Sequence, residues 1–98
     1  MTYTVTSQVI KPESVSFWKD SDPENFAKYA NVISNSVGVI SFTESDPTST
    51  KITATIVCED ANSWDSLVVT LNQDSYAHLR NVYNSTNGIT ETWTAVTS

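Results

Sequence analysis

Three patterns in the 98-residue sequence predict a small α+β domain with the element order β, α, β-hairpin, α, β. Residues 39–43 and 52–58 each alternate apolar and hydroxyl side chains, and the polar loop between them contains the turn-forming pair Asp46-Pro47. An amphipathic helical segment lies on each side of this hairpin, and one more alternating segment lies beyond each helix. The simplest arrangement is the ferredoxin-like βαββαβ sandwich, in which right-handed crossovers place both helices on one face of a four-stranded antiparallel sheet.

The first strand is predicted over residues 2–10, because apolar and polar side chains alternate there. Three side chains form its apolar face: Tyr3, Val5 and Val9. Pro12 ends the strand, since proline cannot donate a ladder hydrogen bond. Residues 14–21 show no clear period, so a turn of helix, a short extra strand and an extended arm all stay open for this segment.

The first helix is predicted to begin at Asp22, which can accept a hydrogen bond as N-cap, with Pro23 at the first helical position. Four apolar side chains then share one helical face: Phe26, Tyr29, Ala30 and Ile33. We expect this helix to end near residues 34–36, and Gly38 to let the backbone turn into the hairpin.

The second helical region is predicted to start after the N-cap Asp60 and to be interrupted at residues 72–74. Its first part carries an apolar stripe of Trp64, Leu67, Val68 and Leu71. Asp74 can cap a second part, whose shared face is expected to hold Tyr76, Leu79 and Tyr83, with Val82 at its margin. Asn87-Gly88 is typical of a left-handed helix stop, and residues 89–96 alternate as the last strand.

In the ferredoxin-like topology, the first strand lies between the third and the fourth. These three neighbouring strands are the ones in which threonine recurs at alternate positions. The sheet face away from the helices should therefore be rich in threonine, a residue suited to a half-buried pleated surface. Seven side chains form this candidate dimer face: Thr4, Thr6, Thr53, Thr55, Thr90, Thr92 and Thr94. Such a face can be exposed to water or can meet a partner sheet, and both stay open here, with a homodimer through it as our expectation. Ice binding is disfavoured because a sheet of this size twists.

Composition excludes several classes of partner. The formal net charge of -6 argues against nucleic acid and anionic membranes, which require clustered basic residues. The single cysteine, Cys58, excludes an internal disulfide, and no Cys/His cluster suggests zinc. Without a signal-peptide pattern or an apolar run of about 20 residues, we expect a soluble, cytoplasmic protein in which residues 1–98 form one domain.

Four short stretches resemble the antibiotic biosynthesis monooxygenase-like group of dimeric α+β barrels. They are Lys11-Pro12 after the first strand, Ser36-Val37-Gly38-Val39 before the hairpin, Glu59-Asp60 with Trp64 at the second helix, and Asp74-Ser75-Tyr76. The resemblance implies a homodimer formed through the open sheet faces and a pocket in each subunit between sheet and helices. Haem-degrading members use an asparagine on the first strand, where this chain offers Thr4, Thr6 and Gln8. The architecture is therefore carried over, and the catalytic residues are not.

Seven aromatic side chains are candidates to line such a pocket for a flat apolar ligand, although a small core needs the same residues. They are Tyr3, Tyr29, Phe42, Trp64, Tyr76, Tyr83 and Trp93. His78, the only histidine, is expected at a boundary or in solvent, and Cys58 is expected in the core as a small hydrophobe. The acids of residues 20–24 are interpreted as a capped helix start and not as a calcium loop.

The leading functional hypothesis is a noncatalytic homodimeric binding or assembly module that needs no cofactor or metal, because no paired catalytic groups are evident. The alternative is a cofactor-independent monooxygenase-like enzyme, which requires an enclosed pocket with at least two converging polar groups. A third hypothesis is a component of a larger assembly such as a virus particle, which the Ser/Thr/Asn-rich, charge-poor composition permits.

Overall fold

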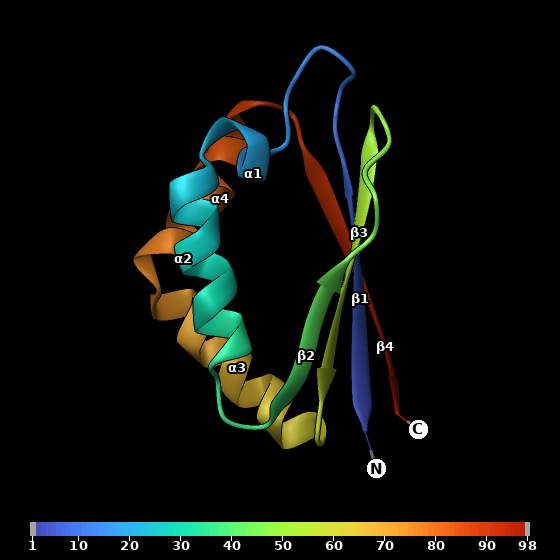
Figure 1. Cartoon of the computed structure of the whole chain (residues 1–98), viewed down its shortest axis with the longest axis vertical. Coiled ribbons are helices and arrows are strands. Elements are labelled where there is room, and N and C mark those ends of the chain that lie inside the picture. Colours follow the sequence, from blue (N-terminus) through green and yellow to red (C-terminus); the bar gives the residue numbers. More distant parts are fainter. Residues whose placement is uncertain (1, 98) are drawn as a thin grey trace.

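The computed structural model describes residues 2–97, in which four antiparallel strands form one sheet in the order β2-β3-β1-β4. The strands are β1 (Tyr3–Ile10), β2 (Val39–Glu44), β3 (Lys51–Cys58) and β4 (Thr90–Thr97). The helices are α1 (Trp18–Ser21), α2 (Pro23–Ser34), α3 (Ala61–Gln73) and α4 (Ser75–Thr86). All the helices lie on one face of the sheet (Figure 1), so the predicted ferredoxin-like fold is confirmed.

Aspartates begin the three longer helices, as predicted. The Asp22 carboxylate accepts a hydrogen bond from the Asn25 backbone N–H, and Asp60 accepts one from Ser63 at 2.8 Å. Asp74 ends α3 and caps α4 by accepting from the Ala77 backbone N–H at 2.9 Å. Side-chain acceptors at this position satisfy backbone donors that have no partner within the helix. The hydrogen bonds from Ser63 also lower the pKa of the Asp60 carboxyl.

Segment 14–21, which the sequence left open, contains the single helical turn α1. Phe17 and Trp18 are buried at 4% and 5% exposure. Phe17 packs in the core cluster beside β1 and β3, and Trp18 in the cluster beside α2 and α4. The Tyr83 hydroxyl of α4 donates to the Ser16 carbonyl at 2.7 Å and ties the segment to α4. The irregular period therefore reflects a short, packed connection.

Strand register confirms that threonines share the face away from the helices. Thr6 on β1 lies between Thr55 on β3 and Thr94 on β4, and Thr55 in turn pairs with Thr43 on β2. The alternate residues of β1 point to the helices, and among them Val5 is 1% exposed. The sheet therefore has one apolar face under the helices and one threonine-rich open face.

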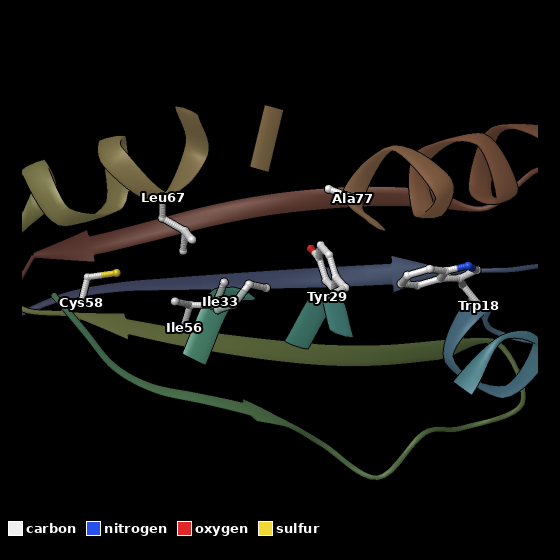
Figure 2. Packing of buried hydrophobic residues seen from close by; sticks show 7 residues of the cluster. All are labelled: Trp18, Tyr29, Ile33, Ile56, Cys58, Leu67 and Ala77. Carbon is white, nitrogen blue, oxygen red and sulfur yellow. The ribbon is translucent and has the colours of Figure 1, made fainter. Parts of the chain in front are cut away.

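Most of the core lies between the sheet and helices α2, α3 and α4 (Figure 2). Ile33 of α2 and Cys58 of β3 are fully buried there, and Leu67 of α3 is 1% exposed. The predicted inward direction of Cys58 is confirmed, and burial raises the pKa of its thiol. Such a thiol is inert compared with an exposed one.

One prediction about α4 is wrong. Leu79 was expected on the buried face, but it is 43% exposed, and the buried side chain of α4 is Ala77. Helix α4 is rotated so that Ala77 and Arg80, which are three residues apart, turn toward the sheet. A hydrophobic stripe could not predict this rotation because a charged residue takes one of the inward positions.

The two glycines give a matched pair for testing backbone conformation. Gly38 and Gly88 have φ of +85° and +70°, where an added Cβ is strained. A Cβ at Gly38 would also collide with the Ser63 side chain, whereas the nearest atom at Gly88 is Pro12 Cγ at 3.9 Å. We expect Gly88→Ala to lower the free energy of unfolding by about 1 kcal/mol. Gly38→Ala should cost clearly more in the same urea titration, and equal losses would contradict the collision.

Candidate functional site

A largely buried ion pair joins the helix layer to the sheet. Arg80 of α4 donates two hydrogen bonds to the two carboxylate oxygens of Glu91 on β4, at 2.9 and 2.6 Å. The side chains are only 14% and 15% exposed. Partial burial lowers the pKa of Arg80, but the hydrogen bonds to Glu91 and nearby negative groups raise it overall. Arg80 is therefore a fixed, permanently charged donor inside the protein.

Tyr29 lies beside this pair. The Arg80 guanidinium carbon is 5.5 Å from the centre of the Tyr29 ring, within the range of a cation–π contact. Burial raises the pKa of the Tyr29 phenol above its ordinary value, opposed by Arg80 and reinforced by Glu91, Asp74 and Glu44. At neutral pH Tyr29 is thus a neutral phenol that can donate or accept a hydrogen bond.

An inner cavity of about 30 Å³ lies between the helices and the sheet next to these groups. It is lined by Ser7, Val9, Phe26, Tyr29, Ile33, Phe42, Glu44, Ile52, Ala54, Ile56, Arg80, Glu91 and Trp93. Polar groups from three strands and two helices thus meet apolar and aromatic walls. The inner cavity is large enough for a water molecule, but its volume is far below the several hundred Å³ of typical ligand pockets.

A second cavity of about 40 Å³ adjoins the first toward α1. The two share five lining residues: Val9, Phe26, Glu44, Ile52 and Arg80. At this end Lys19 of α1 lies 3.6 Å from the Glu44 carboxylate of β2, with both side chains less than a quarter exposed. Only a few side chains therefore separate the two cavities. The Lys19–Glu44 ion pair links α1 to the sheet beside the second cavity.

The structure brings together three of the seven aromatic pocket candidates, since Tyr29, Phe42 and Trp93 line the inner cavity. Tyr83 lines a separate surface groove. The other three pack partly buried against the core: Tyr3, Trp64 and Tyr76. Trp64 contacts Trp93 with ring centres 5.6 Å apart, so it supports the cavity wall from behind.

All seven threonines of the candidate dimer face lie on the open side of the sheet, as the register of β1 with β3 and β4 requires. Apolar side chains lie among them. Val57 and Val96 flank Thr4 in its row, and Val96 is 64% exposed. At the end of the face where β1 finishes, Ile10 is 43% exposed. This open face is consequently less polar than threonine alone would make it.

The sequence-based prediction missed the polar members of the site, above all Arg80 and Glu91. A signal was present in both. Arg80 follows the buried Ala77 by three residues on α4, and Glu91 alternates with Trp93 on the inward side of β4. Two opposite charges at inward positions of a helix and a strand indicate a buried pair when the two elements pack together.

Other candidates take ordinary places. His78 is exposed on α4, in agreement with its predicted position. Among residues 2–97, no group of three or more His, Cys, Asp or Glu side chains could hold a metal ion. Within the same range, no helix has the length and apolar character needed to cross a membrane.

Comparisons with known proteins give a result at the level of structure. No family model matches the chain, and no curated protein matches it significantly. A variant of SnoaB, a cofactor-independent oxygenase from Streptomyces nogalater, matches with a TM-score of 0.71 and 12% identity over 99% of this chain and 92% of that one.

Two further structures are provisionally assigned as antibiotic biosynthesis monooxygenases. The protein from Deinococcus radiodurans has a TM-score of 0.69 at 10% identity, over 100% of this chain and 92% of that one. The protein from Chloroflexus aurantiacus has a TM-score of 0.60 at 12% identity, over 100% and 95%. Identities this low bear on the fold alone. The resemblance seen in the sequence is confirmed at that level: this chain has the fold of the antibiotic biosynthesis monooxygenase-like proteins.

Proposed function

We propose that this protein is a homodimeric binding module that holds a small molecule between its sheet and its helices. The observation that carries the proposal is the buried Arg80–Glu91 pair at the wall of the inner cavity, beside Tyr29. An ion pair costs much to remove from water and stabilises a fold little better than apolar packing would. Charged groups kept at a cavity wall therefore support a binding role.

The side chains around the cavity favour a particular ligand. Phe42 and Trp93 offer aromatic surface, and Arg80 and Tyr29 offer hydrogen-bond donors. This combination suits a flat, mainly apolar molecule with one oxygen-bearing group. Binding requires the two cavities to merge and widen, because neither reaches the size of a ligand pocket. The single turn α1 is the element whose displacement would open the space from the Lys19–Glu44 end.

The homodimer is supported by the open sheet face. Exposed Val96 and Ile10 lie on a surface otherwise dominated by threonines, and a second copy could cover both. Sheets pack face to face through side chains of this size and polarity. The monooxygenase-like fold supports the same arrangement.

Titration with 1-naphthol, followed by calorimetry, tests the binding site. We expect saturable binding at one site per chain. Ala54→Ile should weaken it at least tenfold, because Ala54 lines the inner cavity and the larger side chain fills it. The neighbouring Thr53→Ile makes the same strand more apolar on the open face, and should leave affinity within about twofold, or about 0.4 kcal/mol.

Urea unfolding of both variants confirms that they are folded. Equal affinities of the wild type and Ala54→Ile would refute the inner site, and so would the absence of saturable binding by the wild type.

A second candidate function is cofactor-independent oxygenation of the bound molecule. It is favoured by the presence of at least two polar groups at the inner cavity and by the fold shared with the oxygenase SnoaB. Oxygen uptake with 1,4-naphthohydroquinone, without added metal or flavin, tests it. Uptake above the rate of autoxidation that disappears in Ala54→Ile supports oxygenation when the product gains an oxygen atom from O2. Uptake that yields only 1,4-naphthoquinone and hydrogen peroxide is oxidation without oxygenation, and binding without uptake leaves the module noncatalytic.

A further inference from the structure

An exposed apolar stripe runs along the outer side of α4. Leu79 and Val82 are 43% and 49% exposed, and they share this side with Tyr83 and Thr86 at helical spacing. The structure thus leaves Leu79 and Val82 outside the core, whereas Tyr83 packs partly buried against it. Exposed apolar residues that gather on one surface often mark an interaction site.

The stripe forms one wall of a groove of about 330 Å³, which we name the α4 groove. Its lining residues are Trp18, Asp22, Leu79, Val82, Tyr83, Thr86 and Asn87. The opposite wall comes from α1 and the start of α2, which lie beside α4 at one end of the helix layer (Figure 1). This groove is about ten times larger than the inner cavity and can accept apolar side chains without rearrangement.

Negative charge lies on the α1 side of the α4 groove. Asp22 lines it while its carboxylate also accepts hydrogen bonds from Asn25, and the exposed Asp20 lies on α1. The carboxyl-terminal end of α4, which carries the negative end of the helix dipole, reaches the groove at Thr86. The nearby lysines are engaged elsewhere, since Lys19 pairs with Glu44 and Lys28 with Glu24. The groove is therefore apolar at its base and anionic at its rim.

We propose that the α4 groove binds an amphipathic, basic helical segment of another protein. Its apolar side chains would contact Leu79 and Val82, and its lysine or arginine residues would meet the acidic rim. A second copy of this chain fits poorly. In a two-fold contact through the groove, the acidic rims of both copies would lie in one interface, and none of the described basic residues lines the groove to pair with them.

Residues 2–97 offer little free positive charge for such a self-contact, since among their basic side chains only Lys51 is both exposed and outside an ion pair. Four of the chain's five basic side chains are already engaged: Lys11 with the Ser49 carbonyl, Lys19 with Glu44, Lys28 with Glu24, and Arg80 with Glu91. A partner that supplies positive charge is therefore favoured over a copy. The α4 groove and the second cavity share Trp18, so a ligand that displaced α1 would also alter the groove.

Fluorescence anisotropy with a labelled synthetic helix of leucine and lysine, arranged amphipathically, tests the proposal. We expect saturable binding of one peptide per chain, and no comparable binding of the same helix with glutamate in place of lysine. Val82→Glu should weaken binding at least tenfold, or about 1.4 kcal/mol, because it puts a charge at the base of the groove. Leu79→Glu should do the same, which guards against one variant being misfolded.

Val37→Glu is the matched control, since Val37 is 94% exposed away from the groove and the change adds the same charge. A purely electrostatic attraction would be strengthened alike in Val37→Glu and Val82→Glu, and that result would overturn the proposal. Asp20→Asn should weaken binding severalfold and reduce its salt dependence. The protein could instead self-associate through the groove, and Val82→Glu would then abolish that self-association. This result would overturn the proposal and identify a second copy as the occupant.

Discussion

Glu91→Ala is expected to lower the free energy of unfolding by about 3–5 kcal/mol, because it leaves the Arg80 guanidinium buried without its partner. This is a large share of the roughly 5–15 kcal/mol that stabilises a typical domain. Urea denaturation followed by tryptophan fluorescence measures it. The control is Glu24→Ala, which removes the exposed 3.7 Å pair with Lys28 and should cost no more than about 0.5 kcal/mol.

Replacing both partners separates an unpaired charge from lost packing. Arg80→Met combined with Glu91→Leu removes the charges and keeps similar volumes, so the double variant should regain most of the stability lost in Glu91→Ala. It should also fail to anchor a polar ligand, if the inner site acts as proposed. A Glu91→Ala variant as stable as Glu24→Ala would show that Arg80 finds water or another acceptor, and that the pair is not effectively buried.

Thr6→Lys is expected to convert the proposed homodimer into a monomer at micromolar concentration. Thr6 lies at the middle of the open face, between Thr55 and Thr94, and a lysine there would carry an unpaired charge into the interface. The substitution also makes the negatively charged chain less negative, so general repulsion between copies would decrease. Only loss of the specific contact would therefore dissociate the dimer.

Sedimentation velocity measures this outcome. Thr70→Lys places the same substitution on an exposed position of α3, in the helix layer, and should leave the dimer intact. A wild-type protein that sediments as a monomer would contradict the dimer directly. If both Thr6→Lys and Thr70→Lys dissociate the dimer, the open face is not the interface.

Local chemistry made most of the fold predictable from the sequence. Asp22, Asp60 and Asp74 each provide an acceptor at the point where a helix begins, and Gly38 and Gly88 adopt positive φ where the chain leaves a helix. These signals act within a few residues, so they do not depend on tertiary contacts. Alternation in β1 and β3 likewise fixed which side of each strand faces the helices.

The candidate site was harder to predict because it depends on contacts between distant segments. Arg80 and Glu91 are inward only once α4 packs on the sheet, and the apolar alternative, Leu79, looked better suited to the core. The aromatic candidates divided for the same reason. Tyr29 and Trp93 reach the cavity, whereas Tyr76 packs against the core outside it. The aromatic side chains indicated a hydrophobic core. Their type alone could not show which of them line the inner cavity.

A crystal structure of the protein soaked with 1-naphthol tests the central claim most directly. The account predicts ligand density between the sheet and the helices, in contact with Trp93 and Phe42 and with its hydroxyl near Arg80 or Tyr29, and a displaced α1. Ligand density confined to the α4 groove or another surface, with the inner cavity unchanged, would contradict it.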